Sequence, residues 1–154
     1  MAKLSTFRTD TRAVNDGAFV RVDEAQFGDL EIKTRGFTDA FVDAQNARLT
    51  KAALSHDGDQ SRIPNAERRA INAGLLRDHL VLDVRNLEGD DGLPVTREAF
   101  LDLLDQPEYG RLMGACWRAA AKINARGAEQ AAEAVGNFVP PSGASSNGDS
   151  SAPT

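Results

Sequence analysis

The apolar residues of this chain change their spacing once along the sequence, and that change limits the fold. Residues 18–22 read A-F-V-R-V and residues 30–33 read L-E-I-K, so apolar and polar residues alternate as in strands with one buried face. From residue 38 onward the apolar residues recur three or four positions apart, which is typical of amphipathic helices. Two or three short strands are marginal alone. We therefore expect an antiparallel hairpin or small sheet that packs on the helices.

Turn and capping signals divide the second part of the chain into about four helices, which makes the fold class α+β and mostly α. Thr38 and Thr96 precede two of these helices and are expected to cap their first turns. The segment between the two predicted strands, residues 23–26, is polar and is expected to be a loop. The predicted helices cover residues 38–54, residues 64–86, residues 97–105 and a segment that starts near residue 108.

Leu80 is expected at the centre of a buried helix face. A helix over residues 64–86 places Leu76, Leu80, Val84 and Leu87 at intervals of four, four and three residues. These intervals put the four side chains on one side of the helix. The sequence therefore predicts that this stripe belongs to the core.

The composition also changes at the end of the chain. Ser, Pro and Gly make up ten of the fifteen residues from 140 to 154, and none of the others is a large apolar residue. Such a segment cannot offset its ordering entropy by burial. We expect a single domain over residues 1–139, β-rich over 1–37 and helical over 38–139, followed by a disordered tail over 140–154.

Charge and composition exclude several classes of protein. The chain carries 18 Lys and Arg against 23 Asp and Glu, a net charge of -5, which argues against nucleic acid as the main partner. No apolar run approaches the ~20 residues of a membrane span, and the first residues lack the apolar region of a secretory signal. Cys116 is the only cysteine. An internal disulfide and a multi-cysteine zinc site are thereby excluded, and a reducing cytosol is the expected compartment. Cys116 lies on an apolar helix stripe and is expected to be a buried small hydrophobe.

The residues that most resemble a metal or catalytic site do not complete one. Residues 57–61 read D-G-D-Q-S, like the start of a calcium loop, but Arg62 and Arg68 occupy the positions that need Gly and a bidentate Glu. His79 has no second ligand at metal spacing, and Asp83 is expected to pair with it on one helical face. The chain also lacks a nucleophile elbow and a glycine-rich phosphate loop. We therefore expect no catalytic group, no metal and no cofactor.

Several segments together resemble the tail assembly chaperones of long-tailed, siphovirus-like bacteriophages. The resemblance covers roughly residues 12–125. It consists of short segments that mark where helices begin and end and where turns occur. Its segments are I-K-T-R-G-F-T-D-A-F (32–41), H-L-V-L-D-V-R-N-L (79–87), G-L-P-V-T (92–96), F-L-D-L-L (100–104), D-Q-P-E-Y (105–109) and C-W-R-A-A-A (116–121).

The resemblance implies a non-enzymatic protein of the host cytoplasm that is absent from the mature virion. Such a chaperone is thought to coat the tape measure protein and to recruit tail tube subunits. Its function needs exposed apolar surface on an acidic body, and several copies on one client would add avidity. Self-association of the chain is therefore also open, whereas nucleic acid and membrane are not expected partners.

Phe37, Phe41 and Trp117 are the candidate partner-binding residues, since aromatic side chains dominate interface hot spots. We expect a fold of this size to leave these three large side chains partly exposed. Trp117 is either a core residue or an exposed interface anchor, and its position beside the apolar stripe of the helix favours the core role. Two alternative functions stay open at this point. One is a minor structural protein of the phage tail or head–tail connector. The other is a small metal-binding or enzymatic domain that uses His79 and the loop at Asp57.

The composition of the tail leads to a first prediction. Truncation after Val139 should shift the thermal midpoint by no more than about 2 °C, because residues 140–154 offer no core side chain. Thermal unfolding of the full and truncated chains, followed by circular dichroism, measures the shift. A fall of about ten degrees would show that the tail packs against the domain.

Overall fold

The computed structural model describes residues 1–126. Its contacts divide the chain into two units. Among the described residues, the first unit comprises residues 1–11 together with 125–126. In this unit the N–H of Asp10 donates to the carbonyl of Arg126 at 2.9 Å, and the two side chains form an ion pair at 3.8 Å. The predicted tail and the end of the predicted single domain at residue 139 lie outside the described residues.

The second unit, residues 12–124, is built on a small antiparallel sheet. Strands β1 (Ala18–Arg21), β2 (Glu31–Thr34) and β3 (Val81–Arg85) follow one another in the order β1-β2-β3. The register places Val20 opposite Ile32 and Ile32 opposite Val84. These side chains share one face of the sheet, where Ile32 is fully buried. The expected fold class and the small antiparallel sheet are confirmed.

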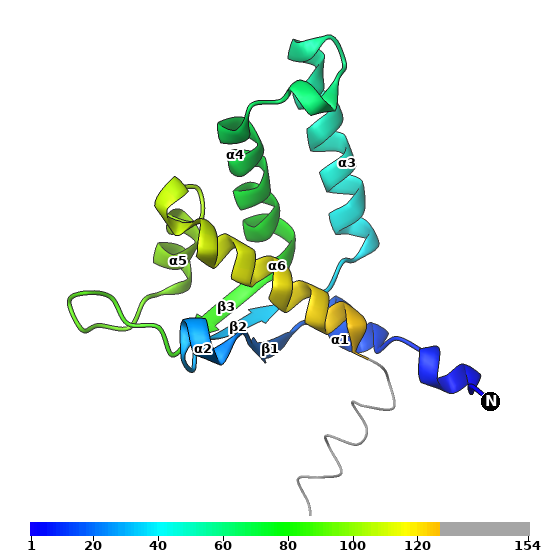
Figure 1. Cartoon of the computed structure of the whole chain (residues 1–154), viewed down its shortest axis with the longest axis vertical. Coiled ribbons are helices and arrows are strands. Elements are labelled where there is room, and N and C mark those ends of the chain that lie inside the picture. The colour runs from blue at the N-terminus through cyan, green and yellow to red at the C-terminus, as the bar shows by residue number, and fades with distance from the viewer. Residues whose placement is uncertain (127–154) are drawn as a thin grey trace, which may run out of the picture. The chain divides into compact units, whose positions relative to one another are not determined.

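Four longer helices pack with the sheet in the second unit (Figure 1). Thr38 caps α3 by accepting from the N–H of Phe41 at 3.2 Å, and Thr96 caps α5 by accepting from the N–H of Ala99 at 3.2 Å. The helices predicted over 38–54 and 97–105 are therefore confirmed together with their caps. The four helices are α3 (Asp39–Ala53), α4 (Asn65–Leu75), α5 (Arg97–Leu103) and α6 (Gly110–Ala125).

The helix predicted over residues 64–86 is wrong in its second half. The α-helix ends at Leu75, a π-helical turn covers Leu76–Leu80, and β3 begins at Val81. The intervals of four residues misled the prediction, because residues four apart share a face in a strand as well as in a helix. Leu80 is nevertheless 1% exposed, as predicted, and Val84 is buried because it lies on the core face of β3.

Two further local predictions are wrong in the N-terminal part. Residues 4–7 and 11–16 are short helices, η1 (Leu4–Phe7) and α1 (Thr11–Asp16), within a segment that was expected to be β-rich. The expected loop at 23–26 holds the one-turn helix α2 (Glu24–Phe27). Asp23 stabilises α2 because its carboxylate accepts from the N–H of Ala25 at 3.0 Å. Local capping thus decides the conformation where the apolar pattern is too short to do so.

Gly17 is the residue that allows α1 to turn into β1. It adopts a φ of +83°, and its N–H donates to the carbonyl of Ala13 at 2.8 Å. A Cβ at this position would lie 2.6 Å from Leu82 and 3.1 Å from the carbonyl oxygen of Thr34. Both the backbone conformation and the space therefore require glycine here.

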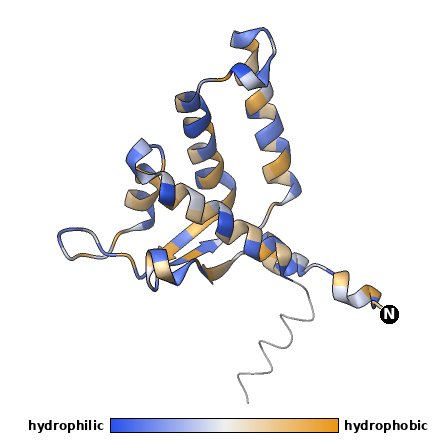
Figure 2. Ribbon diagram, viewed as in Figure 1, coloured by the Kyte–Doolittle hydropathy of each residue, from blue (hydrophilic) through white to orange (hydrophobic). Residues whose placement is uncertain are grey.

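The core of the second unit joins the sheet to the helices. Its members include Ile32, Leu76, Phe100 and Leu104, all fully buried. Helix α6 contributes mainly small residues, since Ala115, Cys116, Ala119 and Ala120 are also fully buried. Small side chains let a helix approach its neighbours closely. Figure 2 shows apolar and polar residues alternating around the helices, as expected for amphipathic elements.

The burial of Leu80 leads to a second prediction. Leu80→Ala should lower the free energy of unfolding by ~2–5 kcal/mol, through lost burial and the residual cavity. Leu54→Ala is the matched control, because Leu54 is 72% exposed and its truncation should cost no more than ~0.5 kcal/mol. Urea unfolding of both variants measures the difference. Equal midpoints would contradict the placement of Leu80 in the core.

Candidate functional site

Three aromatic side chains from two distant segments form one cluster. Phe37 lies just before the cap of α3, Phe41 lies in the first turn of α3, and Trp117 lies in the middle of α6. Their ring centroids are 5.5 Å apart for Phe37 and Phe41, 5.8 Å for Phe41 and Trp117, and 6.5 Å for Phe37 and Trp117. These tilted contacts lie in the range of favourable aromatic pairs. All three sequence-predicted binding residues are thus brought together, which their spacing in the sequence did not indicate.

The three rings differ in exposure. Phe41 is only 3% exposed, so the expectation that it stays partly exposed is wrong. Its position in the first turn of α3 directs it into the core. Phe37 and Trp117 are half-buried and pack against the same core. The cluster therefore has a buried base, Phe41, and an outer layer of two rings that solvent reaches.

Backbone contacts fix the position of the outer rings. The N–H of Phe37 donates to Oδ1 of Asn124 at 3.3 Å, which links the segment before α3 to the end of α6. The neighbouring Gly36 is buried, and its N–H donates to the carbonyl of Val14 at 3.0 Å. A Cβ on Gly36 would lie 3.1 Å from the side chain of Val14. Because several elements hold this segment, Phe37 and Trp117 are preorganised for contact with a partner.

Helices α3 and α4 leave an open groove between them. A cavity of about 370 Å³ is lined by Ala52, Ile71 and the polar residues Arg48, Lys51, Ser55 and Glu67. Helix α3 buries few of its side chains, only Phe41 and Ala53. Arg48, which lines this cavity, also forms an ion pair at 2.7 Å with Asp78 in the π-helical turn. This groove has an apolar floor and a charged rim, and the sequence analysis missed it because the apolar pattern of α3 is weak.

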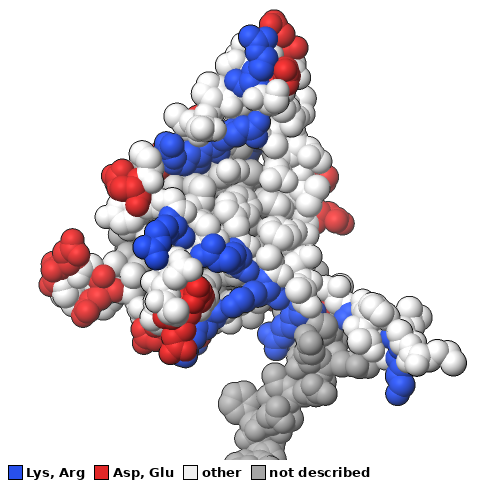
Figure 3. Space-filling view, in the orientation of Figure 1, with Lys and Arg blue, Asp and Glu red and all other residues white. Residues whose placement is uncertain are grey.

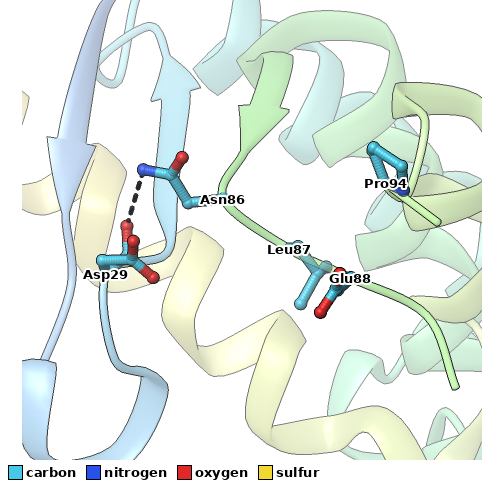
Figure 4. A pocket seen from close by; sticks show the side chains of 5 residues that line it. All are labelled: Asp29, Asn86, Leu87, Glu88 and Pro94. Carbon is cyan, nitrogen blue, oxygen red and sulfur yellow. Dashed lines mark hydrogen bonds between the residues drawn. The ribbon is translucent and has the colours of Figure 1, made fainter. Parts of the chain in front are cut away.

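A second cavity, also of about 370 Å³, lies at the end of strand β3 (Figure 4). It is lined by Asp29, Asn86, Leu87, Glu88 and Pro94. The side-chain amide of Asn86 donates to the carbonyl of Asp29 at 3.1 Å, and Asn86 adopts a φ of +62°. This bond closes the turn after β3. The lining offers two carboxylates and no nucleophile beside a base, so it does not assemble acid–base or nucleophilic machinery.

In the calcium-like loop, residues 57–61, the two carboxylates bond to neighbouring residues of the chain. Asp57 forms an ion pair with Arg62 at 3.1 Å. One oxygen of Asp59 accepts from the hydroxyl of Ser61 at 2.7 Å and from its N–H at 2.9 Å, and these two bonds lower the pKa of Asp59. The carboxylates of Asp57 and Asp59 therefore stabilise the turn through local bonds. Within residues 1–126, no group of three or more His, Cys, Asp or Glu side chains is placed to hold a metal ion.

The predicted pair of His79 and Asp83 does not form on one helical face. His79 lies in the π-helical turn, whereas Asp83 lies in β3 and bonds the N–H of Val84 at 2.8 Å. The predicted pair required a helix that continues to residue 86. Because β3 begins at Val81, His79 and Asp83 are not one helical turn apart. Cys116 is fully buried, and burial raises the pKa of its thiol to about 12. It is therefore an inert core thiol at neutral pH.

On the face of the sheet that points away from the core, the side chains contact one another. The guanidinium of Arg85 lies 3.8 Å from the ring centroid of Phe19 and donates to both carboxylate oxygens of Glu31, at 3.2 and 3.1 Å. The hydrogen bonds from Arg85 lower the pKa of Glu31. Arg85, Glu31 and Phe19 thus satisfy one another on this face of the sheet.

Comparison of the chain with protein-family models, with curated proteins and with solved structures finds no match. Among the described residues, no helix is long and apolar enough to cross a bilayer.

The layered burial of the cluster leads to a third prediction. Phe41→Ala should cost ~3–5 kcal/mol of unfolding free energy, because it removes a fully packed ring. Phe37→Ala should cost clearly less, because part of that ring already faces solvent. Urea unfolding of the two variants gives the comparison. An equal or larger loss for Phe37→Ala would mean that the outer ring is a core residue and is unsuited to partner contact.

Proposed function

We propose that this chain is a non-enzymatic assembly chaperone of a long-tailed bacteriophage. It would bind the tape measure protein in the host cytoplasm, help to recruit tail tube subunits, and leave before the virion is complete. The observation that carries the proposal is the pair of partly exposed rings, Phe37 and Trp117, held rigidly over the buried ring of Phe41. The resemblance of residues 12–125 to such chaperones supplies the identity of the partners.

The aromatic cluster has the properties that a chaperone of helical clients needs. Two adjacent rings with apolar faces can take up a Leu or Ile side chain from an amphipathic helix. Their partial exposure keeps the contact small, so the client is released when tail assembly offers it a larger interface. Because the surrounding contacts already hold both rings in place, little conformational entropy is lost when a partner binds. The contact is therefore weak for one copy and becomes strong when several copies bind one long client.

The groove between α3 and α4 supports the same proposal as a second contact surface. Its floor carries Ala52 and Ile71, and its rim carries charges of both signs. An apolar floor with a polar rim is the usual anatomy of a protein interface. It favours a peptide segment over a small charged metabolite as the ligand.

A minor structural protein of the tail or head–tail connector is the alternative that the same surface permits. Such a protein would bury Phe37 and Trp117 permanently in the particle. The two functions differ in where the chain is found at the end of assembly. Quantitative mass spectrometry of purified virions decides between them, because a structural protein is present in fixed stoichiometry and a chaperone is lost.

The proposal leads to a fourth prediction. When the chain is co-expressed with the tape measure protein encoded in the same genome, that client should stay soluble. Trp117→Ala should weaken capture of the client about 30-fold or more, which corresponds to the ~2 kcal/mol typical of an interface hot spot. Phe37→Ala should weaken it in the same direction. A pull-down of the client at graded concentrations of the chain measures the change.

Tyr109→Ala is the matched control, since Tyr109 is an exposed aromatic residue outside the cluster, at 38% exposure. It should leave capture unchanged. Circular dichroism must show that every variant is folded. Captured client should also resist a high-salt wash, because salt screens charges and leaves apolar contacts intact. A client that stays insoluble with the wild-type chain, or that elutes with salt alone, would overturn the proposal.

A further inference from the structure

One face of α6 carries three cations without carboxylate partners among the described residues. Arg111, Arg118 and Lys122 are seven and four positions apart, so they lie on one side of the helix. Figure 3 shows blue side chains along the course of α6. The three side chains are exposed, and none of them belongs to an ion pair in residues 1–126. We call them the basic face of α6.

The contacts of the basic face are with neutral groups. Arg111 donates to the side-chain oxygen of Gln26 at 3.4 Å, and Lys122 donates to the carbonyl of Arg21 at 3.1 Å. The guanidiniums of Arg111 and Arg118 lie 5.7 and 5.8 Å from the ring of Phe27. These contacts order the cations and leave their charge uncompensated.

One acidic group lies close to the basic face. Asp23 lines a cavity of about 260 Å³ together with Arg118 and Lys122. Its carboxylate accepts from the N–H of Ala25 at 3.0 Å and from the side chain of Gln26 at 2.7 Å. These neutral donors leave Asp23 its charge, but one carboxylate does not balance three cations, so the basic face stays positive and can attract an acidic partner.

The loop between β3 and α5 has the opposite charge. Glu88, Asp90 and Asp91 are exposed and belong to no ion pair in the described part of the chain. Figure 1 shows this loop extending away from the helices and the sheet of its unit, and red side chains mark the same place in Figure 3. We call residues 88–93 the acidic loop.

Backbone bonds hold the acidic loop in one shape. The N–H of Gly89 donates to the carbonyl of Leu93 at 2.8 Å, and the N–H of Leu93 donates to the carboxylate of Asp91 at 3.0 Å. A β-bridge joins Glu88 to Pro94. The side chain of Leu93 is 63% exposed at the end of this loop. An ordered loop with an exposed apolar residue loses little entropy when it docks.

We propose that the acidic loop of one copy of this chain docks on the basic face of α6 in a second copy. The two surfaces carry opposite charge, with three cations on one and three carboxylates on the other, and none of these six side chains belongs to an ion pair within residues 1–126. Because they are different parts of the same molecule, the contact is head-to-tail and builds rings or open rows of copies. The net charge of -5 opposes association at long range, but the local attraction acts within the Debye length of ~10 Å.

Paired charge reversals test this contact. The first variant, Arg111→Glu with Arg118→Glu, makes the face of α6 acidic. The second, Glu88→Lys with Asp90→Lys, makes the loop basic and leaves the bond from Asp91 to Leu93 in place. Lys51→Glu with Arg62→Glu is the control, because it changes the net charge as much as the first variant does at exposed positions outside both surfaces. Sedimentation velocity over a concentration series measures the average mass of each chain.

The wild-type chain and the control should associate at low salt, and their dissociation constants should rise about tenfold or more between about 50 and 500 mM salt. Each reversed variant alone should stay monomeric. An equimolar mixture of the two reversed variants should associate again, because the intact acidic loop of the first variant can dock on the intact basic face of the second, and the two reversed surfaces also carry opposite charge. Circular dichroism confirms that both variants fold.

Three results would overturn the proposal. The first is a wild-type chain that is monomeric at every concentration in low salt. The second is association that survives both reversals and high salt, which would identify an apolar interface such as the aromatic cluster. The third is a mixture of the reversed variants that stays monomeric. If α6 reversal abolishes association and loop reversal has no effect, the role of the acidic loop is overturned as well, because the basic face then meets another acidic part of the second copy.

Discussion

The pairing of β2 with β3 is the interaction on which the second unit depends. It joins the first hairpin to a segment that follows both α3 and α4, and it continues beyond the strands because the N–H of Arg35 donates to the carbonyl of Leu80 at 3.1 Å. To enter this pairing the chain must leave the helical conformation at Leu76–Leu80, which it does in a π-helical turn. Helices α3 and α4 are consequently the connection between two neighbouring strands. That connection leaves the groove between them open.

The close approach of α6 to the core determines where the aromatic cluster lies. Cys116, Ala119 and Ala120 are fully buried, so this side of α6 has no room for a large ring. Trp117 follows Cys116 and is turned away from that side by one helical step. It therefore meets Phe37 and Phe41 at the edge of the core, where one ring is buried and two are partly exposed. The binding surface proposed for the chain is thus a by-product of packing a helix of small residues tightly.

The sequence predicted those elements whose formation depends on interactions between residues that are close together in the chain. The caps at Thr38 and Thr96 and the alternation in β1 and β2 were visible in the sequence, since each depends on residues a few positions apart. The end of α4 and the strand β3 were not, because an interval of four residues fits both periods and only pairing with β2 decides between them. The aromatic residues of the site were identified by type. The contact among these residues and the burial of Phe41 were not predicted. Both depend on the packing of α3 against α6, and these helices are far apart in the sequence.

The two proposed contacts, one with a client through the aromatic cluster and one between copies of the chain, respond to different physical variables, so a chaperone of the proposed kind would control them independently. Contact through Phe37 and Trp117 depends on buried apolar area and is nearly indifferent to salt. Contact between the acidic loop and the basic face of α6 depends on exposed charges and weakens as salt screens them. Copies that touch one another only weakly can arrange themselves along a client and still leave one at a time. A single surface for both purposes would couple the release of the client to the loss of neighbouring copies, whereas two surfaces keep these events apart.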